Sequence, residues 1–424
     1  MCRYSSAFAV LAASALTLVH IDASGPAADP LLERARALHR TAPLVDGHND
    51  YPWAVREKSP SLDLAAVDIR GPQPRTMTDI PRLRAGGVGA QFWSVYVPAS
   101  LQGRAAVRTV LEQIDLVHRL VARYPDTFAL ARTAADVERI FKAGRIASLS
   151  GMEGGHAIDS SLATLRMMYA LGVRYMTLTH SDNVPWADAA TDIPRLGGLS
   201  AFGEEVVREM NRLGMLVDLS HVSPDTMADA LRMSRAPVIF SHSSARAICD
   251  HPRNVPDDIL TSLRANGGVV MVTFVPQFVA PDGGRFYPLQ FAETQRLRAL
   301  HPDDPAAVQA GLREWMKANP GPGATLAMVA DHIDHIRQVA GIDHVGLGSD
   351  FDGIETVPAG LEDVSKFPAL TAELLRRGYS PAEVKKVLGQ NVLRVMREAE
   401  RVAGVLQRER PPSTATLEAL DVKR

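Results

Sequence analysis

Histidine, aspartate and glutamate residues recur in this sequence at places where short apolar segments end. His48 and Asp50 follow the first such segment, and Glu153 follows the third. His221 and His242 directly follow the fifth and the sixth. Imidazole nitrogens and carboxylate oxygens are the ligands that Zn²⁺ takes in catalytic sites. The five residues therefore predict a metal centre, and its chemistry would be hydrolysis by an activated water molecule.

The local spacing supports this interpretation. His48 and Asp50 are two residues apart, so in extended chain both side chains point the same way and can reach one ion. Glu153 precedes two glycines, which allow the backbone to turn tightly beneath a bulky ligand group. His221 and His242 each follow a serine at the end of consecutive apolar segments, and this equivalence favours a shared role.

The balance of charge favours two ions at this centre. The carboxylates of Asp50 and Glu153 would offset only half of the charge of two Zn²⁺. A hydroxide shared by the ions and the nearby Asp350 would meet the remainder. One carboxylate between two ions can hold them about 3.5–4 Å apart, which favours Glu153 as the bridge. The first motif would then bind one ion and the two later histidines the other.

A scaffold must bring these distant residues together. Eight apolar segments end near Val45, Ser94, Met152, Thr179, Ser220, Ser241, Thr273 and Ser349. Amphipathic stretches such as 104–124 and 201–213 lie between them and show the helical period. Strands alternating with helices predict an α/β fold, a closed (β/α)₈ TIM barrel in a single domain over residues 30–405. The candidate ligands would then share the C-terminal mouth of the barrel.

An open, doubly wound sheet is the alternative fold. It would need a glycine-rich phosphate loop after the first strand, and the sequence DGHNDYPW is not one. The connection from Thr273 to His344 is unusually long and predicts an excursion over the mouth, with a helix at 326–339. A final helix is predicted from Ser380 to about Ala403, and residues 406–424 are expected to form a flexible tail.

Residues 1–24 have the pattern of a secretory signal peptide. Arg3 precedes an apolar run at 7–19, which is too short to span a bilayer, and small residues around Ala23 suggest cleavage there. We expect a periplasmic or secreted protein without a stable membrane anchor. Cys249 would be its one remaining cysteine, which leaves no internal disulfide.

The composition excludes several classes of protein. The chain has 424 residues, of which 46% are hydrophobic and 22% charged, as in ordinary globular proteins. With 46 basic and 48 acidic residues the net charge is −2, so the strong positive field that nucleic-acid binding needs is absent.

Longer motifs carry a family resemblance. They are, in order, DGHNDYPW, EGGH, LTHSDNVPWAD, GMLVDLSHVS, PVIFSHSSARAI, RNVPDD and GLGSDFDG, within about 46–395. These motifs resemble those of the membrane dipeptidase (renal dipeptidase) family of zinc peptidases. The resemblance implies a (β/α)₈ barrel with two Zn²⁺ per chain that hydrolyses dipeptides, including those with a C-terminal D-residue.

The resemblance also implies roles for individual residues. Its zinc ligands would be His48, Asp50, Glu153, His221 and His242, with Glu153 bridging. His180 and Arg253 would bind the substrate, and Asp350 would be the catalytic acid and base. His180 would also stabilise the developing oxyanion, while Arg253 would pair with the C-terminal carboxylate of the dipeptide. Asp352 is the alternative to Asp350.

The chain departs from the animal members of that family. Asp182 replaces a cysteine in the motif THSCN, and no hydrophobic tail follows Glu409. The family's disulfides and lipid anchor are therefore not expected, and the chain resembles a bacterial-type exported member. A homodimer remains a possible expectation, but no disulfide would join its subunits.

Two rival functions are considered. One is another binuclear amidohydrolase or lactonase, although such enzymes commonly carry HxH after the first strand and a carboxylated lysine as the bridge. The other is a zinc-binding barrel without catalysis, against which the presence of Asp350 argues.

Other histidines and aromatic residues are given lesser roles. His332 and His335 are expected on a solvated helix face, His251 without a convergent partner and His156 close to the site. Trp53, Tyr51 and Trp186 line either the mouth or the core.

Overall fold

A computed structural model describes Met1 and residues 29–421 of the chain. The predicted signal segment therefore lies, apart from Met1, outside the described residues. Within them, eight parallel strands form a closed barrel in the order β2-β1-β9-β8-β7-β6-β5-β4, and pairing of β2 with β4 completes the ring. This confirms the predicted (β/α)₈ barrel in a single domain and excludes the open sheet.

The eight barrel strands coincide with the predicted apolar segments. They are β1 (Leu44–Asn49), β2 (Val88–Ser94), β4 (Ile146–Met152), β5 (Val173–Thr177), β6 (Leu216–Asp218), β7 (Ile239–Ser243), β8 (Val269–Val272) and β9 (Val345–Leu347). Every residue of these strands is buried, because helices cover one face of a parallel barrel and side chains fill the other. This burial explains why the segments are largely apolar on both faces instead of alternating between apolar and polar residues.

One strand was not predicted. The short strand β3 (Phe128–Leu130) pairs with the first residues of β4, outside the closed ring. Three residues are too few to produce a recognisable period in the sequence.

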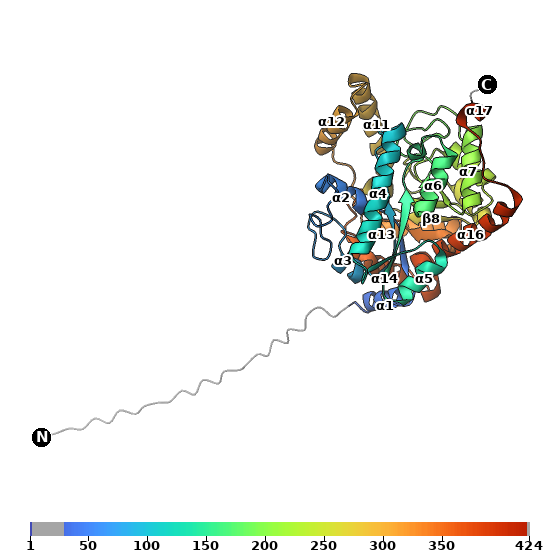
Figure 1. Ribbon diagram of the computed structural model, residues 1–424. Coiled ribbons are helices and arrows are strands. Elements are labelled where there is room, and N and C mark those ends of the chain that lie inside the picture. Colours follow the sequence, from blue (N-terminus) through green and yellow to red (C-terminus); the bar gives the residue numbers. More distant parts are fainter. Residues whose placement is uncertain (2–28, 422–424) are drawn as a thin grey trace.

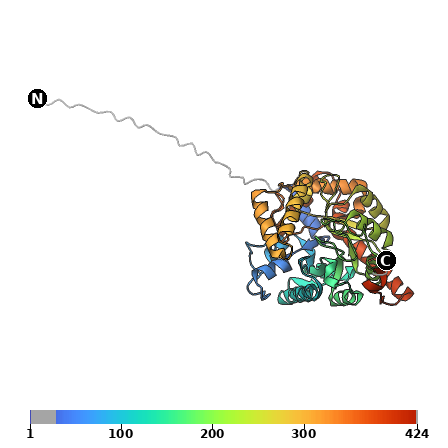
Figure 2. The same cartoon turned by 90° about the horizontal axis from the view of Figure 1, so that it is seen from above.

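Helices surround the barrel, as Figures 1 and 2 show. They are α1 (Pro30–His39), α2 (Tyr51–Lys58), α3 (Ile80–Ala85), α4 (Gly103–Arg123), α5 (Ala134–Lys142), α6 (Leu162–Leu171), α7 (Ala201–Leu213), α8 (Pro224–Met233), α9 (Asp257–Asn266), α10 (Pro276–Val279), α11 (Gly283–Leu300), α12 (Pro305–Ala318), α13 (Leu326–Val339), α14 (Phe367–Arg376), α15 (Pro381–Lys385), α16 (Asn391–Glu409) and α17 (Leu417–Asp421). None of the helices in 29–421 is long and apolar enough to cross a membrane.

The long connection between β8 and β9 contains four helices, α10 to α13. The predicted helix at 326–339 is confirmed as α13. Helices α11 and α12 were not predicted, because their sequences are polar and Pro288 lies inside α11. The two pack against each other and stand out from the barrel in Figure 1. Arg298 of α11 binds Asp182 at 2.6 Å in the loop after β5, so the excursion is joined to the mouth, as expected.

The C-terminal part differs in detail from the expectation. Ser380 caps α15 through the predicted capping box with Glu383. A short π-helical segment, Lys386–Gln390, follows, and α16 then continues to Glu409. The sequence predicts a flexible tail at 406–424, but the described part contacts α7. The Asp421 carboxylate accepts hydrogen bonds from Ser200 Oγ at 2.6 Å and from the Phe202 amide at 3.1 Å. These contacts involve residues distant in sequence, which no local pattern indicates.

Candidate metal centre

The C-terminal ends of four barrel strands bring the five predicted ligands together. His48 Nε2 lies 3.2 Å from Asp50 Oδ2 and 3.3 Å from Glu153 Oε2. The other oxygen of Glu153, Oε1, lies 3.0 Å from His221 Nε2 and 3.4 Å from His242 Nε2. Glu153 therefore faces His48 with one carboxylate oxygen, and His221 and His242 with the other.

The backbone is strained at this site. His221 and Asp350 have positive φ values of 71° and 65°, and neither is a glycine. Such a conformation costs of order 1–3 kcal/mol per residue and persists where the surrounding structure imposes it. Gly353 allows a further close approach, since a Cβ there would lie 2.3 Å from Asp50 Oδ2 and 2.8 Å from Asp350 Oδ1. The loop after β9 thus needs a glycine to sit against both carboxylates.

A hydrogen bond orients the imidazole of His48. Its Nδ1 lies 2.7 Å from the hydroxyl of Tyr175, and that hydroxyl donates to the carbonyl of Gly47 at 3.1 Å. The tyrosine therefore accepts the proton of Nδ1, which leaves the Nε2 lone pair directed into the site.

His242 is oriented in a similar way. Its Nδ1 is 2.8 Å from Ser241 Oγ, and the serine hydroxyl donates to Asp218 Oδ2 at 2.6 Å. The chain imidazole–hydroxyl–carboxylate again directs a lone pair of Nε2 towards Glu153. Ser94 completes this shell by donating to Glu153 Oε2 at 3.2 Å.

Two buried aspartates hold the strands beneath the site. Asp46 accepts hydrogen bonds from the amide of Ser349 at 2.8 Å and from its hydroxyl at 2.7 Å, which joins β1 to the end of β9. Burial raises the pKa of Asp46 to about 6 and also raises that of Asp218, although hydrogen bonds oppose the effect. The sequence analysis missed these residues. Their signal is an acid inside an otherwise apolar strand, in PLVD and LVDLS.

The titration behaviour suits a set of ligands. Burial, with the positive charge of Arg253 nearby, holds the pKa of His221 well below its usual value. Burial and the neighbouring His48 do the same to His242. Burial alone would raise the pKa of Glu153, but the surrounding histidines hold it well below its usual value. Neutral imidazoles and an ionised carboxylate are the forms that bind a metal ion, so the directions at His221, His242 and Glu153 suit ligands. His48 differs, because the opposing effect of its burial is outweighed by Tyr175, Glu153 and Asp50, which together raise its pKa well above the usual value.

The residues present fit divalent cations. His48 Nε2 and Asp50 Oδ1 are buried without a hydrogen-bond partner, and His221 Nε2 and His242 Nε2 face each other at 2.9 Å. Three groups of donors lie within 4.8 Å of one another: His48, Glu153 and His242; Glu153, His180 and His221; and His48, Asp50 and Asp350. Nitrogen and carboxylate oxygen donors of this kind suit Zn²⁺.

Asp350 and Asp352 point in different directions. Asp350 Oδ1 lies 4.0 Å from His48 Nε2, whereas Asp352 Oδ1 accepts the amide of Met77 at 2.7 Å. Burial, together with the charge of Asp50, raises the pKa of Asp350 well above its usual value. Of the two candidate acids, Asp350 is therefore the one that faces the site.

His180 lies beside the other histidines. Its Nε2 is 3.8 Å from Glu153 Oε1, and its ring centroid is 4.4 Å from that of His221 and 5.0 Å from that of Tyr96. The side chain keeps 18% of its surface exposed, so it can meet a ligand that enters from the mouth.

Arg253 is buried next to the site with donors to spare. Its contacts to the carbonyl of His242 and to Ser243 Oγ are long, 3.4 and 3.5 Å, and its Nε has no partner. His251, for which no convergent partner was expected, accepts the backbone amide of Arg253 through Nδ1 at 3.1 Å. A buried guanidinium with free donors is suited to a carboxylate.

Other expectations need correction. His332 was expected on a solvated face, but it is fully buried, accepts the Ala245 amide at 3.0 Å and contacts the carbonyl of Val279 at 2.9 Å. The helix period could not show this, because the buried partners come from the loop after β7 and from α10. Tyr51 and Trp186 are core residues, while Trp53 is half-buried against Tyr96.

Comparison with protein families decides the classification. The model of the family described as membrane dipeptidase (peptidase family M19) matches residues 32–410. The chain belongs to this family. As a membrane dipeptidase family member it is a metallopeptidase that hydrolyses dipeptides, which agrees with the resemblance found in the motifs.

Curated relatives and solved structures agree with this membership. The chain is 42% identical to dipeptidase verJ of Clonostachys rogersoniana, over 88% of this chain and 89% of that protein. It is 45% identical to dipeptidase 3 of Rattus norvegicus, over 88% and 69%. Among solved structures, the probable dipeptidase PvdM of Pseudomonas aeruginosa matches with a TM-score of 0.74 and 26% identity, over 88% of this chain and 99% of that one.

A further solved relative contains a ligand. The metallopeptidase of Rhodobacter sphaeroides, liganded with a phosphinate mimic of L-Ala-D-Ala, is 26% identical to this chain with a TM-score of 0.69. The match covers 84% of this chain and 99% of that structure.

Proposed function

We propose that this protein is a dipeptidase that uses two Zn²⁺ per chain and accepts dipeptides with a C-terminal D-residue. One observation carries the proposal: the two oxygens of Glu153 face separate histidine sets, at 3.3 Å from His48 on one side and 3.0 Å from His221 on the other. When bound there, the two ions would lower the pKa of a water molecule and polarise the scissile carbonyl.

The protein's own groups divide the remaining work. His180 donates a hydrogen bond to the carbonyl oxygen as negative charge develops there. Asp350 accepts a proton from the attacking water and delivers it to the leaving amine. Tyr175 and Ser241 keep the ligand imidazoles in their orientation throughout.

Arg253 supports the restriction to dipeptides. Its free donors lie next to the ligand histidines, so they can pair with the C-terminal carboxylate of a substrate whose scissile bond is only one residue away. A longer peptide would place an amide where this charge is needed. The ligand of the Rhodobacter sphaeroides relative supports L,D-dipeptides as substrates.

Metal content and a substrate panel test the proposal together. We expect two equivalents of zinc per chain by elemental analysis, and hydrolysis of L-Ala-D-Ala that a chelator abolishes and added Zn²⁺ restores. L-Ala-L-Ala measures the stereochemical preference. L-Ala-D-Ala amide and L-Ala-D-Ala-D-Ala are controls, and both should react at least a hundredfold more slowly. Hydrolysis of lactones without dipeptides, or bound zinc without hydrolysis, would contradict the proposal.

Arg253→Lys separates recognition from chemistry. Lysine keeps the charge but loses the forked geometry of the guanidinium, so KM for L-Ala-D-Ala should rise more than kcat falls. A variant with unchanged KM would remove Arg253 from substrate binding.

The location of the protein belongs to the same proposal. We propose that residues 1–24 are a signal peptide cleaved near Ala23, and that the mature enzyme is periplasmic or secreted, with the domain at 30–405. N-terminal sequencing of the protein recovered from outside the cytoplasm would identify the cleavage site. Sedimentation of the mature chain would determine whether a homodimer forms.

A further inference from the structure

A cavity lies at the opposite end of the barrel from the candidate metal centre. It has a volume of about 460 Å³ and lies between α1, the end of α3, the start of β2, the end of α5 and α14. Figure 1 shows α1, α3, α5 and α14 together at the lower end of the barrel, next to the N-terminal ends of the strands. The dipeptide chemistry at the mouth does not use this cavity.

The charged residues that line this cavity are all basic. They are Arg36, Arg40, Arg84 and Arg145, and no aspartate or glutamate is among the lining residues. Arg36 has an acidic partner, Glu33, at 2.5 Å. In 29–421, no carboxylate lies within 4.0 Å of the other three guanidinium groups, although most arginines of the surface have such a partner.

Two of these arginines are fixed by the same turn. Arg84 Nη2 donates to Thr127 Oγ1 at 3.1 Å, and Arg145 Nη1 donates to the carbonyl of Pro125 at 3.3 Å. Each of these bonds uses one donor of a five-donor guanidinium, so further donors remain for a ligand. The two side chains are thus held in place instead of being free in solvent.

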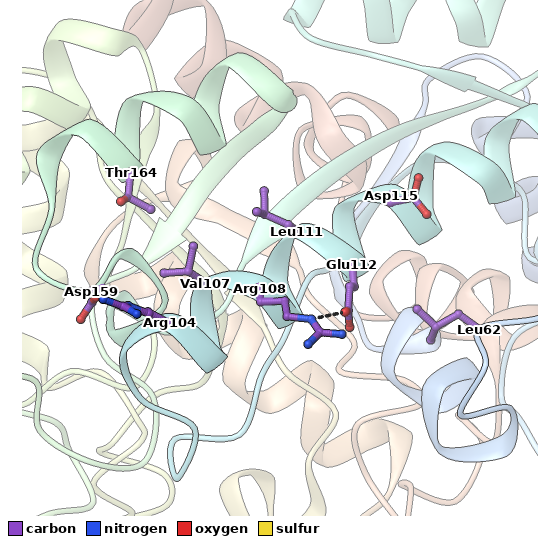
Figure 3. A pocket seen from close by; sticks show the side chains of 9 residues that line it. All are labelled: Leu62, Arg104, Val107, Arg108, Leu111, Glu112, Asp115, Asp159 and Thr164. Atoms are coloured by element: carbon purple, nitrogen blue, oxygen red, sulfur yellow. Dashed lines mark hydrogen bonds and ion pairs between the residues drawn. The ribbon is translucent and has the colours of Figure 1, made fainter.

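A second hollow on the surface shows the usual arrangement. It has a volume of about 590 Å³ and lies along the outer face of α4, where Arg104 and Arg108 share the walls with Glu112, Asp115 and Asp159 (Figure 3). Charges of both signs therefore balance in that hollow. The cavity at α1 differs, because its positive charges lack such a balance while the whole chain carries a net charge of −2.

The remaining wall of the basic cavity is partly apolar. Val88, Phe141, Ile146 and Pro368 contribute to it, with Phe141 half-buried. A purely inorganic anion would leave this apolar surface without a partner. A volume of this size is in the range of pockets that take small organic molecules.

We propose that this cavity binds a small organic anion with a phosphate group, which contacts Arg40, Arg84 and Arg145 while its apolar part packs against Phe141. Guanidinium groups recognise phosphate through paired hydrogen bonds. A concave cavity with an apolar wall favours a soluble molecule over a flat lipid surface. A lipid headgroup carries the same phosphate chemistry, and the experiment separates the two sources.

Calorimetric titration of the full mature chain tests this. The probes are phenyl phosphate, inorganic phosphate and benzyl alcohol. We expect saturable binding of phenyl phosphate, at least tenfold weaker binding of inorganic phosphate and no binding of benzyl alcohol. Binding of phenyl phosphate should weaken as salt concentration rises, because the contacts are ionic.

Variants assign the binding to the cavity. Arg84→Gln with Arg145→Gln should weaken phenyl phosphate at least tenfold. The matched control, Arg34→Gln with Arg104→Gln, removes the same charge from exposed positions that do not line the cavity and should leave the affinity unchanged. Arg40→Gln is the second test, since no hydrogen bond of its side chain stabilises the described fold; it should weaken binding severalfold with an unchanged Tm.

Several outcomes would overturn the proposal. Absence of saturable binding of phenyl phosphate is one, and equal weakening in the control variant is another. Flotation with anionic phospholipid vesicles, in the absence of phenyl phosphate binding, would assign the arginines to a membrane surface. Dipeptidase activity is measured in all variants as a control. Unchanged activity would show that the change in phenyl phosphate binding is independent of the catalytic site.

Discussion

At the scale of single residues, Glu153 has the largest consequences for the site. Its carboxylate contacts His48, His221 and His242, and it accepts a hydrogen bond from the hydroxyl of Ser94. One anion therefore links side chains at the ends of four other strands, β1, β2, β6 and β7. A neutral group of the same shape in its place would keep the packing and lose the charge.

Glu153→Gln should abolish activity without unfolding the protein. We expect kcat/KM for L-Ala-D-Ala to fall at least a thousandfold, which corresponds to about 4 kcal/mol of transition-state stabilisation, and the bound zinc to decrease. The matched control is Glu355→Gln, which removes a charge at an exposed position. Activity within tenfold of the wild type would contradict a role for Glu153 in binding metal.

Tyr175→Phe tests the orientation of His48. The variant keeps the aromatic ring and removes the hydroxyl that accepts the proton of His48 Nδ1. Loss of such a partner usually weakens metal binding 10–100-fold. Competition for zinc with a chelating dye would measure the change. If zinc affinity is unaltered, the hydrogen bond serves packing alone.

The clustering of the candidate ligands could be predicted from the sequence, but the residues that orient them could not. His48 and His242 stand directly after apolar segments, and a barrel brings such positions to one mouth. Tyr175 and Asp218 lie inside strands, and their roles depend on which strands become neighbours and in which register. That information comes from pairings such as Thr177 with Asp218, which no local pattern shows.

At the scale of elements, the hairpin of α11 and α12 is the part that departs most from the alternation of strands and helices in the barrel. Few of its residues are buried, and Arg298 links it to the mouth through Asp182 and, at 3.6 Å, Asp192. Asp182 lies two residues after His180. The loop that carries His180, the proposed substrate-binding residue, is thus joined by an ion pair to a separate element.

Arg298→Gln should loosen this connection with little effect on global stability. A partly exposed ion pair contributes about 0–1 kcal/mol, so Tm should change by only a few degrees. Hydrogen exchange should become faster in 181–192 and 283–300, and KM should rise severalfold. Arg296→Gln is the control, because its partner Glu293 lies on the same helix. Identical exchange in both variants would show that the link does not hold the loop.

The elements that escaped prediction share a physical reason. Strand β3 is too short to show a period, and α11 and α12 lack a wide apolar face because they cover little of the core. Their positions depend on contacts such as that of Arg298, between residues far apart in sequence. The eight barrel strands were predictable because burial on both faces makes them largely apolar, with only a few buried polar residues such as Asp46 and Asp218.

At the scale of the whole molecule, buried neutral histidines make stability depend on pH. His39 joins α1 to α14 and to the turn after α3, through Thr371 Oγ1 at 2.8 Å and the carbonyl of Gly86 at 3.0 Å. Burial lowers the pKa of His39 to about 4, and that of His332 likewise to about 4. Both rings therefore stay largely neutral in the folded protein at mild acidity.

The stability should therefore fall as the pH decreases from 6.5 towards 4. In this window the unfolded chain binds protons that the folded protein excludes, so each histidine costs about 2 kcal/mol at pH 5 relative to pH 8. Urea unfolding at several pH values measures this. His39→Gln should be less stable at pH 8 and show a weaker dependence on pH, while the exposed His301→Gln should match the wild type. An equal dependence in both variants would refute the assignment.

The ring of strands begins with β1 and ends with β9, and Asp46 joins the two through Ser349. During translation, β1 can pair with β2 soon after its synthesis, but about three hundred residues must follow before its second neighbour, β9, leaves the ribosome. A truncated nascent chain contains all five ligands long before that moment, yet has no closed ring to hold them in place. Zinc capture and peptidase competence should consequently arise together, and only once synthesis is almost complete.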